Sequence, residues 1–110
     1  MLNEAKKALR VTAAAYDTEI MSLLQAGARD LQIAGVNLHG RVAWTVSSGA
    51  VVDKSDIKDP LVTRALFTYA AMRFGNPPNY DRLLEAYEAQ KVQLMHAADY
   101  TRYDGGDAEC

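Results

Sequence analysis

The chain has 110 residues, 49% hydrophobic and 24% charged, which suits one soluble globular domain. Its net charge of −2 argues against a protein that grips nucleic acid through the phosphates, because such binding requires a concentrated basic surface. The single cysteine, Cys110, excludes an internal disulfide and a thiolate zinc cluster. No run approaches the ~20 apolar residues of a membrane span, and no apolar signal segment follows Met1, so we expect a cytosolic chain without a membrane partner.

Two helices are predicted in the first third of the chain. Residues 2–9 carry apolar side chains every three or four positions and should form a short helix that packs on another element. A longer helix is predicted over residues 14–34 and is expected to end at Gly35. Gly27 is either a tolerated cost of ~1 kcal/mol or a point where another helix approaches closely. The apolar stripe of the longer helix consists of Ile20, Leu23, Leu24, Ala28 and Leu31.

The stretch 36–58 lacks a helical period and is predicted to form a β-hairpin that projects from a helical body. Val42, Trp44 and Val46 alternate with less apolar residues, and a Ser-Ser-Gly turn precedes a second short apolar run. A lone hairpin is marginal in water, so it should pack on a helix of its own chain or on a neighbouring subunit. Trp44 is accordingly interpreted as an anchor to its own core, with a subunit interface formed by Val42, Trp44 and Val46 as the functional alternative.

Two further helices are predicted between Asp59 and Tyr103, joined by a tight Gly-Asn-Pro-Pro turn. Asp59 can cap the first turn of the third helix, and proline fits its first position. The third helix carries Val62, Ala65, Leu66, Tyr69, Ala70 and Arg73 on one face. The fourth begins near Asn79 and carries Leu83, Leu84, Tyr87, Lys91, Leu94, Met95 and Ala98 on one face.

These elements predict an all-α fold, a small bundle of about four helices with a hairpin-like loop between the second and third helices. Because the connecting turn is short, the last two helices should pack antiparallel. Residues 1–103 are expected to form a single domain, and residues 104–110, which are polar and glycine-rich, a flexible tail.

No catalytic or metal-binding pattern is recognisable. His39 and His96 are far apart in sequence and fit no HExxH-type motif, and no phosphate-binding glycine loop or nucleophile elbow is present. Asp53, Asp56 and Asp59 form a loose acidic run without the spacing of a calcium loop, so a solvated loop is favoured over a cation site. We therefore expect no enzymatic activity, no cofactor and no metal.

The order of the motifs resembles one family. An early helix is followed by Tyr-Asp-Thr-Glu-Ile-Met-Ser-Leu-Leu-Gln-Ala-Gly-Ala-Arg-Asp-Leu, and later come an Asp-Pro-Leu-Val start, an Arg-Phe-Gly stop and a Tyr-Glu-x-x-Lys-x-x-Leu run. In this order the chain resembles the head–tail connector (adaptor) family of tailed bacteriophages and prophages, which are also described as DNA-packaging or head-completion proteins. The resemblance covers most of residues 2–103 and is most specific from Asp59 to Tyr100.

The resemblance implies a structural virion protein at the head–tail interface, made in the cytoplasm of the bacterial host. It implies a homo-oligomeric ring, usually twelve-fold, between the portal protein and a stopper or tail-completion protein. The ring extends a channel that double-stranded DNA passes without specific binding, and relatives can be monomeric before assembly. The residues that correspond to the portal contact of relatives are Lys91, Leu94, Met95, Tyr100, Arg102 and Tyr103.

The residues leave one alternative open, a small helical regulatory or DNA-binding module. Such a module requires a basic recognition helix. The third predicted helix, with only Arg64 and Arg73, is a poor candidate.

Overall fold

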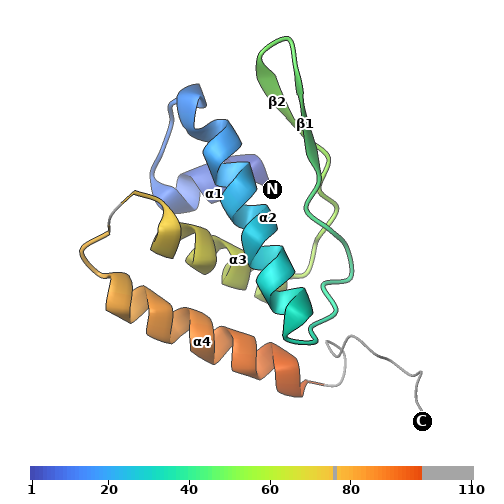
Figure 1. Cartoon of the computed structure of the whole chain (residues 1–110), viewed down its shortest axis with the longest axis vertical. Helices are drawn as coiled ribbons and strands as arrows, with labels where there is room; N and C mark the ends of the chain where they lie inside the picture. The colour runs from blue at the N-terminus through green and yellow to red at the C-terminus, as the bar shows by residue number, and fades with distance from the viewer. Residues whose placement is uncertain (76, 98–110) are drawn as a thin grey trace.

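The computed structural model describes residues 1–75 and 77–97, which form a mainly helical body and a projecting two-stranded antiparallel sheet (Figure 1). The elements are α1 (Leu2–Leu9), a 3₁₀ turn η1 (Ala14–Tyr16), α2 (Asp17–Ile33), β1 (Trp44–Ser47), β2 (Ala50–Asp53), α3 (Pro60–Arg73) and α4 (Tyr80–His96). The four predicted helices and the hairpin are therefore confirmed. The fold is mainly helical rather than all-α, because the loop between α2 and α3 contains a regular two-stranded sheet.

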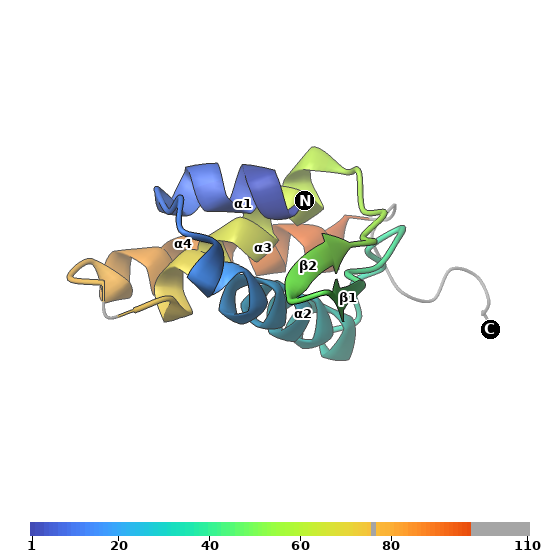
Figure 2. The same ribbon diagram turned by 90° about the horizontal axis from the view of Figure 1, so that it is seen from above.

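Helix α3 is the centre of the body. It packs against α4, α2 and α1, and Figure 2 shows it between α1 and α2. Helix α4 runs antiparallel to α3 after the short turn, as predicted (Figure 1). The largest fully buried side chains are Ile20, Met21, Leu24, Leu31, Val36, Leu38, Val62, Leu66, Tyr87 and Leu94.

Helix α3 begins and helix α2 ends for the reasons that the sequence predicts. Asp59 Oδ1 accepts hydrogen bonds from the N–H groups of Leu61 (2.8 Å) and Val62 (3.3 Å), with proline at the first helical position. Gly35, at φ +96°, ends α2. Its N–H and that of the next residue donate to carbonyls in the last turn, at 3.0 Å each, so the free carbonyls of the helix end are satisfied.

Helix α1 ends in the same motif, but with an arginine in place of glycine. Arg10 has φ 60° and ψ 43°, and its N–H donates to the carbonyl oxygen of Lys7 while that of Val11 donates to Lys6. A side chain with a Cβ is strained in this left-handed conformation. The end of α1 therefore carries a backbone strain that the sequence pattern did not reveal.

Gly27 marks a close approach between helices, which was one of its two sequence interpretations. A Cβ added there would lie 3.0 Å from two ring atoms of Tyr69 on α3 and 3.2 Å from the Cβ of Tyr69. The glycine is buried and allows α2 and α3 to approach more closely than a larger residue would permit.

The hairpin turns tightly at Ser48 and Gly49, whose φ angles are 52° and 79°. Two consecutive positive φ angles are typical of a type I′ turn, which matches the twist of the paired strands. Trp44 lies opposite Asp53 in the register, and Val46 lies opposite Val51. The hairpin thereby forms an arm, residues 44–53, that lies beside α2 (Figures 1 and 2).

Candidate interaction surfaces

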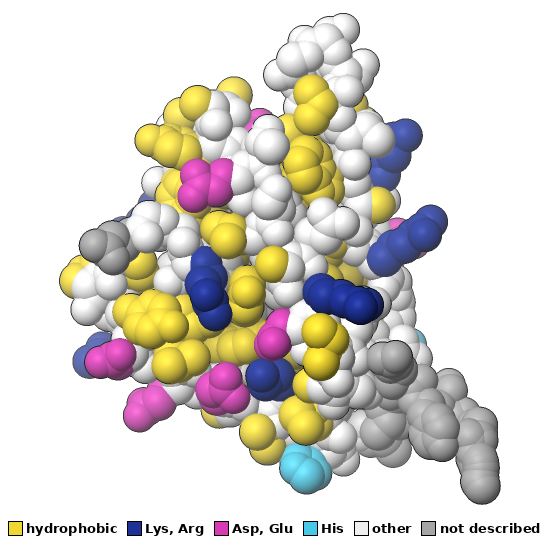
Figure 3. Space-filling view, viewed as in Figure 1, with side chains coloured by type: hydrophobic (Ala, Val, Ile, Leu, Met, Phe, Trp, Pro, Cys, Tyr) yellow, Lys and Arg dark blue, Asp and Glu magenta, His cyan; other side chains and the backbone are white. Residues whose placement is uncertain are grey.

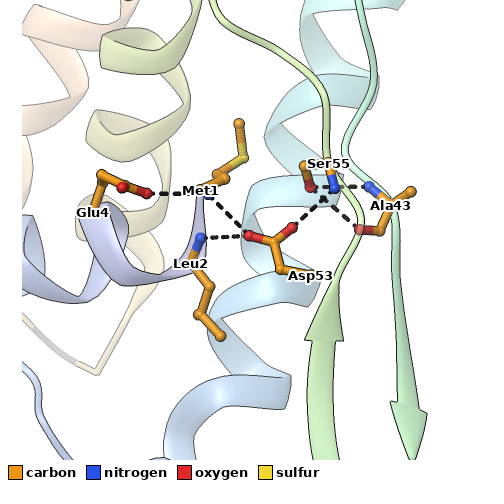
Figure 4. A network of polar contacts seen from close by, with 6 residues as sticks. All are labelled: Met1, Leu2, Glu4, Ala43, Asp53 and Ser55. Atoms are coloured by element: carbon orange, nitrogen blue, oxygen red, sulfur yellow. Dashed lines mark hydrogen bonds and ion pairs between the residues drawn. The ribbon is translucent and has the colours of Figure 1, made fainter.

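The base of the arm is fixed to the start of α1 by one carboxylate (Figure 4). Asp53 Oδ2 accepts from the N–H of Leu2 at 2.7 Å and pairs with the α-amino group of Met1 at 3.0 Å. Its Oδ1 accepts from the N–H of Ser55 at 3.0 Å. The N–H of Ala43 donates to the Ser55 hydroxyl (3.1 Å), which donates to the Ala43 carbonyl (3.3 Å). These bonds join the two segments of the chain at the base of the arm.

The electrostatics of this network favour an ionised carboxylate. Burial alone raises the pKa of Asp53, but the hydrogen bonds from Leu2, Ser55 and the α-amino group outweigh it and lower the pKa to about 2. The pKa of the Met1 α-amino group is raised, since its contacts with Asp53 and Glu4 outweigh burial, which lowers it. The two charges therefore stabilise each other at neutral pH.

The acidic run lies at the end of β2 and in the loop that follows, where Asp56 is exposed, and its three carboxylates also accept structural hydrogen bonds. Asp53 holds α1, Asp59 caps α3, and Asp56 Oδ1 accepts from the N–H of Arg41 at 2.7 Å. Within residues 1–75 and 77–97, no three His, Cys, Asp or Glu side chains are grouped so that they could hold a metal ion.

A second polar network joins α2 to α4. The Tyr87 hydroxyl donates to Asp30 Oδ2 at 2.5 Å, and Lys91 Nζ donates to the same oxygen at 3.2 Å. Lys91 Nζ also lies 5.4 Å from the centre of the Tyr87 ring. Burial first, and then the hydrogen bond to Asp30, raise the pKa of Tyr87 well above its ordinary value. These three residues fix the position of α4 on α2.

The residues expected at the portal contact differ in accessibility. Leu94 is only 2% exposed and belongs to the core, and the Lys91 side chain, 19% exposed, is paired with Asp30. Met95 is 39% exposed. Three of the expected residues, Tyr100, Arg102 and Tyr103, lie outside the described part of the chain.

Two further exposed apolar residues were not predicted from the sequence, one near Met95 on α4 and one at the end of α2. Val92 on α4 is 48% exposed, and Ile33, the last residue of α2, is 72% exposed. Figure 3 shows hydrophobic side chains over α4 and the end of α2 on this face. Val92 lies off the apolar stripe of α4, and Ile33 comes after the last residue of the α2 stripe. An apolar residue outside the buried stripe of its helix was the sequence feature that could have indicated an exposed apolar surface.

The arm residues expected at a subunit interface also differ in accessibility. Val42 is 7% exposed, and Trp44 is partly buried, packs against the core and donates from Nε1 to Gln25 Oε1 at 3.1 Å. The anchor interpretation of Trp44 is therefore confirmed. Val46 is 56% exposed and is the accessible apolar residue of the three.

A groove of about 560 Å³ follows the face of α3 that is opposite to α2. Its α3 residues recur every three or four positions, on the side away from Val62 and Leu66. Sequence reasoning assigned α3 a single apolar face and missed this one, although Phe67 lies off that face. The groove is lined by Ala8, Lys58, Pro60, Thr63, Arg64, Phe67, Thr68, Ala71 and Leu83.

The arm, the groove and the exposed apolar end of α4 define a class of protein: a small, mainly helical domain with several exposed apolar surfaces. A family model described as phage connector protein matches residues 1–101, and the chain belongs to this family. No curated protein and no solved structure gives a significant match. The family is structural rather than enzymatic and indicates a place in the phage virion. Among the described residues, no helix has the length and apolar character needed to cross a membrane.

Proposed function

We propose that this connector subunit forms a ring between the portal and a stopper or tail-completion protein, and that the ring extends the DNA channel at the head–tail interface. Membership of the connector family is the observation that carries the proposal. A ring requires heterologous contacts, in which one face meets a different face of the next copy. The arm beside α2 and the groove on the opposite side of α3 are unlike faces of this kind.

Within the ring, Val46 is the proposed arm residue that contacts the neighbouring subunit. Trp44 and Val42 hold the arm on its own body, and Asp53 fixes its base to α1. These three residues therefore act on the subunit interface by positioning the arm. The carboxylate network supports this role because it resists displacement of the arm at neutral pH.

The proposed portal surface is the exposed apolar end of α4, continued by Tyr100, Arg102 and Tyr103. Val92 and Met95 offer accessible apolar area on this helix, which a protein partner can bury. Lys91 and Leu94 are proposed to act indirectly, since they hold α4 on the body.

The net charge of −2 supports a channel wall that does not retain DNA. Light scattering and negative-stain microscopy, on the protein alone and with its cognate portal, test the proposal. Rings, or rings that form only with the portal, are expected. A protein that stays monomeric under both conditions overturns it, and tight DNA binding with a steep salt dependence favours the DNA-binding alternative.

The portal surface has a matched pair of variants. Met95→Glu places a charge on the proposed surface and should weaken portal binding at least tenfold. Tyr80→Glu, at the other end of α4 and 37% exposed against 39% for Met95, should leave binding unchanged. Equal binding by both variants contradicts the assignment of this surface.

A further inference from the structure

The groove on α3, one of the two unlike faces of the proposed ring, is an apolar hollow of about 560 Å³. Its floor is formed by Phe67, which is partly buried against the core, with Ala71 and Leu83. A smaller hollow of about 340 Å³ shares Lys58, Thr63 and Phe67 with it and continues along α1 toward Met1. An extended segment can therefore lie along α3 with apolar side chains pointing to its floor.

The charges of the groove favour an acidic occupant. Lys58 and Arg64 are exposed at its rim, and neither forms an ion pair with another described residue. The described residues that line the groove include no carboxylate. The smaller hollow, in contrast, is lined by Glu4 and Asp56, so an acidic segment is favoured in the first hollow only.

We propose that residues 98–110 of the same chain bind this groove. The segment contains four carboxylates and one arginine, which complement the two cations of the rim. It also contains Tyr100 and Tyr103, whose rings can cover the apolar floor while their hydroxyl groups stay at the polar edge.

The geometry of the helical pair brings this segment to the groove. Because α3 and α4 are antiparallel, the end of α4 lies beside the start of α3, where Lys58 and Pro60 line the groove (Figure 1). The groove follows α3 from Pro60 to Ala71, a length of ~16 Å at the rise of an α-helix. Thirteen residues can span up to ~43 Å, so the segment is long enough to follow the groove within one subunit.

This binding has a consequence for assembly that rests on the proposed function. Residues 98–110 include Tyr100, Arg102 and Tyr103 of the proposed portal surface, so the groove and the portal compete for one segment.

The single cysteine allows a direct test on the full chain. A nitroxide attached to Cys110 should broaden the amide resonances of Phe67, Ala71 and Leu83 in the isotope-labelled protein. The amides of Ser48 and Gly49, at the tip of the arm and away from α3 and α4 (Figure 1), should keep their intensity. Uniform broadening, or none at the groove, overturns the proposal. A second sample mixes two kinds of chain: one carries the nitroxide but no isotope label, and the other carries the isotope label but no nitroxide. Broadening at the groove in this mixture shows that the segment binds a neighbouring copy and overturns binding within one subunit.

Charge reversal tests the rim. Lys58→Glu/Arg64→Glu should abolish the broadening at the groove, and adding Asp104→Lys/Asp107→Lys should restore it. The matched control Lys54→Glu/Arg82→Glu has the same charge change outside the groove and should leave the broadening unchanged. Loss in the control, or no rescue, contradicts recognition by charge. These measurements need no portal, so a failure of portal binding leaves their outcome unaffected.

Discussion

The carboxylate of Asp53 is expected to hold the arm on α1, and Asp53→Asn tests this. The pKa of this carboxyl group is lowered from 3.8 to about 2, a difference that corresponds to ~2.4 kcal/mol. The Asp53 side chain is 20% exposed, and solvent screening reduces this contribution to ~1–2 kcal/mol. Asparagine keeps the size of the side chain but loses its charge and one acceptor oxygen. We therefore expect a loss of ~1–2 kcal/mol in the free energy of unfolding at pH 7.

The pH dependence has a fixed sign because the folded pKa lies below the unfolded one. The stabilisation is fully present above pH 3.8 and is lost as the pH falls through about 2. Urea unfolding of the wild type and the variant at pH 7 and pH 2.5 measures the difference, with Asp81→Asn, an exposed carboxylate on α4, as the control for lost charge. A difference that is absent at pH 7, or equal at both pH values, refutes the assignment.

Three further changes test the packing, and each is measured by urea unfolding. Arg10→Gly removes a Cβ from a left-handed position and should stabilise the protein by ~0.5–1 kcal/mol; destabilisation contradicts the strain at φ 60°. Tyr87→Phe should cost ~1–2 kcal/mol, because the bond to the Asp30 carboxylate is lost while Lys91 still pairs with it. Gly27→Val should cost ~2–3 kcal/mol, since its Cβ meets the Tyr69 ring at 3.0 Å; a neutral effect shows that the helices can separate there.

Much of the fold follows from local rules that can be applied to a sequence. The Asp-Pro start of α3, the glycine after α2 and the alternation around Trp44 depend on a few neighbouring residues, and each predicted element is present. The left-handed Arg10 could not be predicted, because no glycine or asparagine marks it. The roles of Asp53 and Asp56 also depend on N–H groups distant in sequence, which only the tertiary arrangement brings to them.

The interaction surfaces were less predictable, for a physical reason. A periodic apolar stripe indicates which face of a helix is buried, but it cannot show that a central helix such as α3 has neighbours on several sides. The groove around Phe67 lies in the gap that α1 and α4 leave on the side of α3 away from α2, so its existence depends on where those helices end. The exposed Val92 likewise becomes informative only when the neighbouring residues of α4 are known to be covered.

One motif of the family resemblance describes packing rather than partner recognition. In the Tyr-Glu-x-x-Lys-x-x-Leu run, Tyr87 and Lys91 both bind Asp30 of α2, and Leu94 is buried in the core. These three residues fix where α4 lies, and a change in any of them disturbs every surface that α4 carries. Val92 lies between Lys91 and Leu94 and Met95 follows Leu94; both are exposed, so they can change without loss of the fold. Partner specificity on this helix is therefore expected to reside in the positions that the motif leaves unspecified.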